Sequence, residues 1–160
     1  MKRLLFIVIV ILLTACNNTI YVVRHAEKEA QGANMSADVP LSTAGTERAE
    51  ALRDLLKDKK ISAIFSTKFL RTRGTALPLS QSINIPILDY DARDTLFVTK
   101  VKEMKKNILI VGHSNTVDNI INSLTHKPLI QDLPETQYGD LFILRKKMGG
   151  YTLEKSRYGK

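Results

Sequence analysis

A run of four apolar residues, 20–23, stops at Arg24 and His25, and no other stretch constrains the fold as strongly. Its β-branched and aromatic side chains, with no polar residue among them, are typical of a strand buried on both faces of a sheet. Such a strand delivers the residues that follow it to the carboxyl edge of the sheet, where open α/β sheets bind ligands. Arg24 and His25 would bring a fixed cation and a titratable nitrogen to that edge. The alternative is a surface pair after a strand, and the rest of the chain decides between the two.

Strand and helix patterns alternate through the remaining sequence. Apolar runs predict strands at residues 61–65, 85–88 and 108–111, and Gly149-Gly150 predicts a closing hairpin of strands 141–144 and 151–154. Helices are predicted at 46–57, with a cap at Ser42 or Thr43, at 95–106, and from a cap at Asn115 or Thr116 to 124. A short helix is also predicted to carry Arg71 and Arg73, before Pro78 either interrupts it or opens a new turn at an N1 position. The alternation predicts an α/β fold: a three-layer α/β/α sandwich with a mostly parallel central sheet and an antiparallel C-terminal hairpin.

Two histidines and two arginines are expected at the carboxyl edge of this sheet. Arg71 follows the second strand closely, and His113 comes directly after the strand at 108–111, so both join Arg24 and His25. Guanidinium groups match the geometry of phosphoryl oxygens, and a neutral histidine among them can attack phosphorus. A second, protonated histidine can stabilise charge on those oxygens. The set predicts a phosphate pocket.

A zinc site is the rival use of His25 and His113. The flanking arginines oppose a metal ion, and no cysteine or clear third ligand accompanies the two histidines. The third histidine, His126, lies in a basic loop after a helix and is assigned to the surface. We therefore expect no metal and no cofactor.

The charge of the chain favours an anionic ligand. Its 24 Lys and Arg residues exceed its 16 Asp and Glu residues, which gives a formal net charge of +8. No tract combines basic residues with interleaved aromatic ones, so nucleic acid is disfavoured as a partner. A length of 160 residues suits one domain.

The first 15 residues read as a targeting segment. Lys2 and Arg3 precede ten apolar residues, 4–13, which is too short a run for a membrane span of about 20 residues. The following Thr14-Ala15-Cys16 resembles the lipobox of bacterial lipoproteins, whose cysteine is lipidated; an ordinary secretory signal is the alternative. We expect a signal peptide at 1–15 and a single domain at 16–160. A lipid on Cys16, the sole cysteine, would anchor it to the bacterial cell envelope.

Four segments in order resemble the histidine phosphatase superfamily, whose fold is phosphoglycerate mutase-like. They are residues 22–27, residues 41–45 with 48–49, residues 65–67 with 71–76, and residues 111–114. The resemblance implies that His25 is the nucleophile that becomes phosphohistidine. It also implies that Arg24, Arg71 and His113 bind the phosphate. Arg73, about 200° around a helix from Arg71, is assigned to the surface.

The chain departs from this family in its proton donor. Ser114 stands where acid-phosphatase-type members have an aspartate, and the third-strand region offers no glutamate like that of the mutases. Asp94 is our first candidate for the donor and Glu27 the second. The absence of a strong proton donor would suit substrates whose leaving group needs little protonation, such as phosphohistidine or acyl phosphate. Ala26, in place of the signature glycine, is a change that other members tolerate.

We expect a hydrolase of phosphomonoesters or phosphoramidates, acting on a small phosphorylated substrate or a phosphoprotein in a shallow, open site. Export from the cytoplasm argues against a glycolytic mutase. A phosphate-binding protein of the same fold without turnover is the alternative, and a structural lipoprotein is a third possibility. Because His25 must be neutral and His113 cationic, activity should peak at mildly acidic to neutral pH. Arg24 and Arg71 should lower the pKa of His25 below its ordinary value of about 6.5, and bound phosphate should raise that of His113.

Overall fold

The computed structural model describes residues 18–30, 32 and 38–160, so the predicted signal peptide and Cys16 lie outside the described residues. In chain order the elements are β1 (Thr19–Arg24), α1 (Thr43–Leu56), β2 (Ile61–Ser66), α2 (Leu70–Ile83), β3 (Ile87–Asp89), α3 (Phe97–Glu103), β4 (Asn107–Gly112), α4 (Ser114–Thr125), β5 (Asp140–Lys147) and β6 (Gly150–Arg157). None of the helices in this part of the chain combines the length and apolarity needed to cross a membrane.

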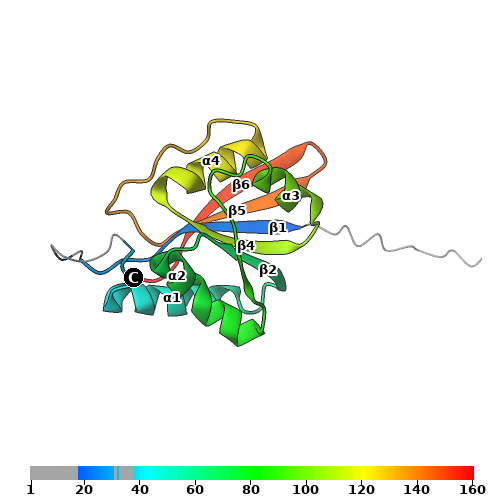
Figure 1. The fold of residues 1–160 in the computed structure, drawn as a ribbon. Helices are drawn as coiled ribbons and strands as arrows, with labels where there is room; N and C mark the ends of the chain where they lie inside the picture. Colours follow the sequence, from blue (N-terminus) through cyan, green and yellow to red (C-terminus); the bar gives the residue numbers. More distant parts are fainter. Residues whose placement is uncertain (1–17, 31, 33–37) are drawn as a thin grey trace, which may run out of the picture.

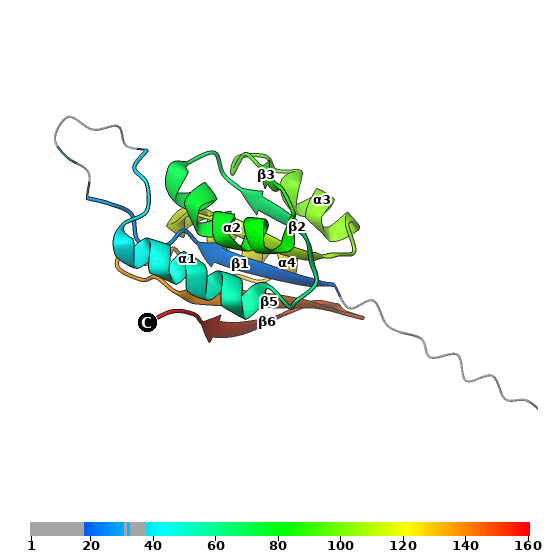
Figure 2. The same ribbon diagram turned by 90° about the horizontal axis from the view of Figure 1, so that it is seen from below.

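The strands form one mixed sheet in the order β3-β2-β4-β1-β5-β6. The strands β3, β2, β4 and β1 are parallel, whereas β5 pairs antiparallel with β1 and β6 pairs antiparallel with β5. Helices α3 and α4 cover one face and α1 and α2 the other (Figures 1 and 2). The predicted three-layer α/β/α fold, with its antiparallel hairpin at the C-terminus, is confirmed.

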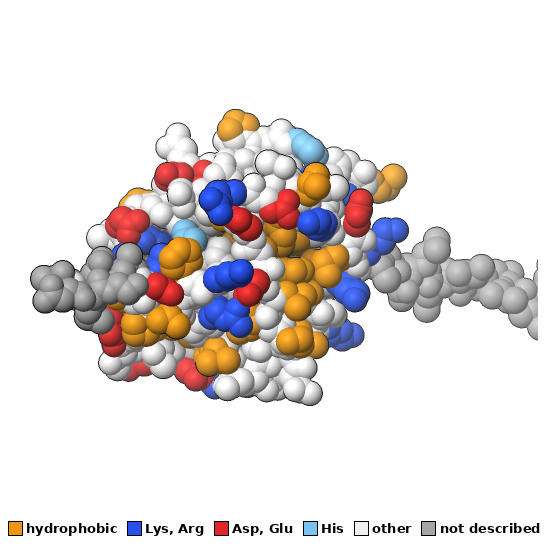
Figure 3. Space-filling view, in the orientation of Figure 1, with side chains coloured by type: hydrophobic (Ala, Val, Ile, Leu, Met, Phe, Trp, Pro, Cys, Tyr) orange, Lys and Arg blue, Asp and Glu red, His pale blue; other side chains and the backbone are white. Residues whose placement is uncertain are grey.

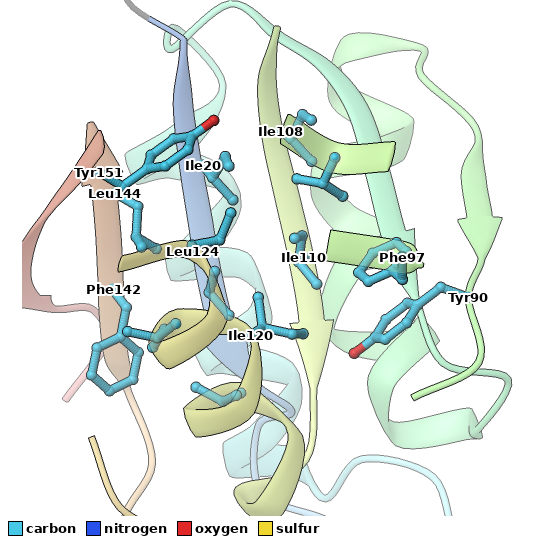
Figure 4. Packing of buried hydrophobic residues seen from close by; sticks show 14 of the residues in the cluster. Ile20, Tyr90, Phe97, Ile108, Ile110, Ile120, Leu124, Phe142, Leu144 and Tyr151 are labelled. Atoms are coloured by element: carbon cyan, nitrogen blue, oxygen red, sulfur yellow. The ribbon is translucent and has the colours of Figure 1, made fainter. Parts of the chain in front are cut away.

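The central strands are buried on both faces, as their uniform apolarity requires. On the α3/α4 face, Ile20, Ile108 and Ile110 pack with Ile120 and Leu124 of α4 (Figure 4). On the α1/α2 face, the alternate residues of β1 and β4 pack against the two helices; the buried residues there include Tyr21, Val23, Leu109, Val111, Leu52, Leu56, Ala76 and Leu79. Because helices seal both faces, a ligand can approach these strands only at their ends.

Several predicted helix boundaries are wrong. Helix α3, predicted at 95–106, runs only from Phe97 to Glu103. Helix α2 runs without a break through Pro78 to Ile83, because Ala76 and Leu79 on either side of the proline pack against the sheet. This packing offsets the roughly 3 kcal/mol that an interior proline costs. Helix α4 starts at Ser114, with His113 and not Asn115 or Thr116 as its N-cap.

The N-cap of α1 is Ser42, which was one of the two predicted candidates, and not Thr43. Its Oγ accepts a hydrogen bond from the Gly45 N–H at 3.1 Å, and its own N–H donates to the Glu27 carbonyl at 3.0 Å. A Cβ on Gly45 would lie 2.0 Å from that same carbonyl oxygen, so only glycine lets α1 approach this closely. The start of α1 is thereby fixed against the segment that follows His25.

Candidate active site

His25 lies directly beyond the end of β1, and its ring is oriented by the backbone. Its N–H donates to the Gly112 carbonyl at the end of β4 (2.9 Å), and only 4% of the residue is exposed. The ring Nδ1 lies 2.8 Å from the Ala26 carbonyl oxygen. A carbonyl oxygen can only accept, so the proton of neutral His25 is on Nδ1. The lone pair of Nε2 is therefore available for attack.

Arg24, at the end of β1, is buried and held by the loop of residues 126–139. Its Nη1 donates to the carbonyl oxygens of Pro134 (2.7 Å) and Gln137 (3.3 Å), and its Nη2 donates to Glu135 Oε2 (2.9 Å). The guanidinium also lies over the ring of Tyr138, 4.7 Å from the centroid. Its buried Nε has no acceptor among the described residues. Arg24 itself is not among the residues that line the pocket beside His25, so this buried N–H lies just behind the pocket wall.

Arg71 comes from the first turn of α2. Its side chain is 13% exposed, and its guanidinium lies over the Phe69 ring at 4.5 Å and 3.8 Å from Asp38 Oδ1. Arg73 instead forms an ion pair with Asp89 at the edge strand β3. Arg71 thus lies at the pocket and Arg73 on the surface, as their positions around the helix predicted.

His113, the N-cap of α4, is held by a chain of two threonine hydroxyl groups. Its Nε2 lies 2.9 Å from Thr67 Oγ1, which lies 2.9 Å from Thr72 Oγ1. The Thr72 hydroxyl lies close to two carbonyl oxygens, which only accept, so it donates to them and accepts from Thr67. Thr67 then accepts from His113, which places the proton of neutral His113 on Nε2. The ring centroids of His25 and His113 are 5.5 Å apart.

Both histidines are neutral at pH 7 in the absence of a ligand. Burial lowers the pKa of His25 to about 4, with smaller contributions from Arg24, Arg71 and His113 in the same direction. Burial, followed by the two arginines, lowers the pKa of His113 to about 4 as well. The predicted direction for His25 is confirmed, although burial and not the arginines is the main cause. His113 can become cationic only when a bound anion offsets these effects.

A pocket of about 460 Å³ lies over this group. It is lined by His25, Lys28, Phe69, Arg71, His113, Ser114, Asn115, Asp132 and Glu135. A second pocket of about 520 Å³ shares Phe69, His113 and Asn115 with it, so the two adjoin. Within the described ranges, no three histidine, cysteine or acidic side chains are grouped to hold a metal ion. In Figure 3, a histidine side chain is visible at the surface, among charged and hydrophobic side chains, on the side of the molecule where β1 and β4 end.

Neither predicted proton donor lines this pocket. Asp94 accepts from Lys100 Nζ (3.0 Å) and the Leu96 N–H (2.9 Å), and it lines a separate hollow beside α3. Glu27 points instead to Arg48, whose Nε donates to its two oxygens at 2.9 and 2.8 Å. Arg48 fixes the carboxylate there.

The carboxylates that do line the pocket, Asp132 and Glu135, were missed from the sequence. Both come from the loop of residues 126–139, which has no strand end or helix pattern to place it. The sequence around them contains no motif that marks a site, because the loop reaches the pocket only through its contacts with Arg24 in the folded chain.

The model of the "histidine phosphatase superfamily (branch 1)" matches residues 20–96 of this chain, which include Arg24, His25 and Arg71. The predicted resemblance to this superfamily is confirmed. A putative phosphohistidine phosphatase SixA from Agrobacterium tumefaciens has the same fold, with a TM-score of 0.67, 21% identity, and coverage of 87% of this chain and 97% of that chain. No match was found among curated proteins.

Two further solved structures share the fold at lower identity. A putative alpha-ribazole-5'-P phosphatase from Escherichia coli has a TM-score of 0.68 and 17% identity, and covers 88% of this chain and 96% of that chain. A mycobacterial glucosyl-3-phosphoglycerate phosphatase has a TM-score of 0.68 and 12% identity, and covers 89% of this chain and 98% of that chain. At these identities the likeness extends to the fold alone, and their different named substrates leave that of this chain open.

Proposed function

We propose that this protein is a phosphohydrolase that forms a phosphohistidine intermediate on His25. The observation that carries the proposal is the orientation of His25, whose Nδ1–H is bound to the Ala26 carbonyl so that Nε2 is free to attack. The guanidinium groups of Arg24 and Arg71 are near enough to lower the pKa of His25, and the ring centroid of His113 lies 5.5 Å from that of His25. The superfamily match and the names of the structural relatives support a phosphatase.

In the first step, Nε2 of His25 attacks phosphorus in line with the leaving group. The new N–P bond forms as the bond from phosphorus to the leaving-group oxygen or nitrogen breaks, and the electron pair departs with the leaving group. The Nε–H of Arg24, the guanidinium of Arg71 and a protonated His113 bind the equatorial oxygens, where negative charge develops. Water then cleaves the phosphohistidine and releases inorganic phosphate.

The test is turnover of p-nitrophenyl phosphate by the domain from Asn17 onward, beside His25→Ala. We expect the variant to lose activity by at least about 10³-fold, because it lacks the nucleophile. His126→Ala is the matched control, since His126 is an exposed histidine at the far end of α4. Equal activity in the parent and His25→Ala would refute the proposal. Phosphate binding without turnover would favour the alternative, a phosphate-binding protein of the same fold.

We also propose that the domain is tethered to the bacterial cell envelope through a lipid on Cys16. The support is the sequence alone: a basic start, ten apolar residues and a cysteine at the lipobox position. Expression of the full chain in a bacterium with radiolabelled palmitate should label the parent and leave Cys16→Ser unlabelled. A parent that stays unlabelled would contradict the tether without affecting the proposal for His25.

A further inference from the structure

Hydrolysis of a phosphohistidine is accelerated by a group that takes a proton from the attacking water. Asp94 and Glu27, the candidates from the sequence, are held away from the pocket by Lys100 and Arg48. Of the described residues that line the pocket with His25, two carry a carboxylate, namely Asp132 and Glu135. The choice of base is thus reduced to these two side chains of one loop.

Glu135 is held at the pocket by contacts to both sides of the site. Its Oε2 accepts from Arg24 Nη2 at 2.9 Å, and its Oε1 accepts from the Ser114 hydroxyl at 3.4 Å. Arg24 precedes His25 and Ser114 follows His113, so the carboxylate is tied to the neighbours of both histidines. Its side chain is 73% exposed, which allows it to exchange protons with solvent. The Arg24 charge is the main cause that lowers the pKa of Glu135, so the group is ionised at neutral pH.

Asp132 is directed toward a second carboxyl group. It lies beside the carboxyl group of Asp118 of α4, which is only 9% exposed. Burial, and then the charge of Asp132, raise the pKa of Asp118. Asp132 therefore faces a second acid in the helix, whereas both oxygens of Glu135 contact residues adjacent in sequence to the site histidines.

We propose that Glu135 is the general base for the water that cleaves the phosphohistidine. This inference rests on the proposed function. The water oxygen forms a bond to phosphorus while the P–N bond to His25 breaks, and that electron pair returns to Nε2. The proton of the water passes to the Glu135 carboxylate and then to solvent, and inorganic phosphate leaves. Arg24 holds the same carboxylate and the phosphoryl group, so it places the base beside the reacting centre.

The test is Glu135→Gln with p-nitrophenyl phosphate, whose leaving group departs without a proton donor. The amide oxygen of glutamine can still accept from Arg24 and its amide nitrogen can donate to the Ser114 hydroxyl oxygen, but glutamine cannot take a proton from water. We expect a burst of about one equivalent of nitrophenolate, followed by steady turnover about 10²-fold or more slower than in the parent. Phosphate that is labile to acid and stable to alkali should accumulate on His25.

Glu154→Gln is the matched control, because Glu154 of β6 is an exposed carboxylate that forms a surface ion pair and does not line the pocket. This variant should turn over at the parental rate without accumulating phosphoenzyme. Parental turnover in Glu135→Gln would overturn the inference, as would loss of the burst together with turnover, which would mean that Glu135 only positions Arg24. Accumulation in Asp132→Asn instead would overturn it in favour of Asp132. If the parent itself fails to turn over or matches His25→Ala, the proposed function fails, and this inference fails with it.

Discussion

The two sides of the pocket are built in different ways. One side consists of strand and helix ends, where His25, Arg71 and His113 are held by backbone contacts, helix turns and a chain of threonine hydroxyls. The other side is the loop of residues 126–139, whose Glu135 is largely exposed and is held by Arg24 and Ser114. This difference matches the division of work in the proposed mechanism, in which the sheet side binds and attacks the phosphoryl group and the loop side activates the water.

Arg24 joins the two sides, so its replacement should have the largest effect on activity. Arg24→Met removes a proposed phosphate ligand and the donor to Pro134, Gln137 and Glu135. We expect kcat/KM for p-nitrophenyl phosphate to fall by about 10³-fold or more, with a loss of about 1–3 kcal/mol in the free energy of unfolding. Steady-state kinetics and urea denaturation measure the two effects. A loss of activity without any change in stability would mean that the loop does not depend on Arg24.

The stability of the two sides can be compared with a matched pair of alanine variants. Ile110 of β4 is fully buried, and Leu133 of the loop belongs to the same apolar cluster at 8% exposure. We expect Ile110→Ala to cost about 2–5 kcal/mol and Leu133→Ala about 1–3 kcal/mol, because a loop can relax around the lost volume. Urea denaturation checks both values. Equal losses would show that the loop is packed as firmly as the sheet.

The stability of the sheet side should depend on pH through its two histidines. The pKa values of His25 and His113 are lowered from 6.5 to about 4, so the unfolded chain binds protons that the folded chain does not. Stability should therefore be fully present above pH 6.5 and decrease as the pH falls toward 4. Denaturation at pH 4.5, 5.5, 6.5 and 7.5 tests this, and His25→Gln should flatten the dependence. Constant stability over this range would contradict the neutral state of the pair.

The hydroxyl chain behind His113 offers a smaller change on the same side. Thr67→Val keeps the shape of the side chain and removes the acceptor for His113 Nε2–H. We expect kcat/KM to fall about 5- to 10-fold, which corresponds to about 1 kcal/mol for one hydrogen bond. Steady-state kinetics of Thr67→Val beside Thr67→Ser, which keeps the hydroxyl and should retain activity, checks the role of this bond. Equal losses in both variants would point to packing and not to the hydrogen bond.

The smallest effect on stability is expected at the loop carboxylate. Glu135→Ala should change the free energy of unfolding by about 1 kcal/mol or less, because ion pairs with an exposed partner contribute little. Thermal or urea denaturation checks this value. A loss of several kcal/mol would show that Glu135 serves the fold of the loop, and would weaken the comparison from which its chemical role was inferred.

Residues at strand ends could be predicted because their signals are local. The apolar runs before Arg24 and His113 mark buried strands, and parallel strands share one carboxyl edge, so these side chains had to come close together. The predicted helix boundaries were wrong where a tertiary or capping contact outweighed the local preference of the residues. Packing of Ala76 and Leu79 carried α2 through Pro78, and Thr116, whose Oγ1 accepts from the His113 N–H, started α4 earlier than predicted.

The positions of the strands along the chain, and the expectation that Arg24, His25, Arg71 and His113 share one edge of the sheet, followed from the pattern of apolar residues. The order of the strands in the sheet came from the structure. The position of the Glu135 carboxylate could not be predicted from that apolar pattern. Asp94 lies close to a strand end and was chosen for that reason, yet its nearest cation, Lys100, holds it elsewhere. Glu135 stands in a loop with no periodicity, and its place depends on a buried arginine more than a hundred residues earlier. A contact between residues so far apart in the sequence depends on the assembled sheet, so the tertiary structure alone could bring this carboxylate to the pocket of His25.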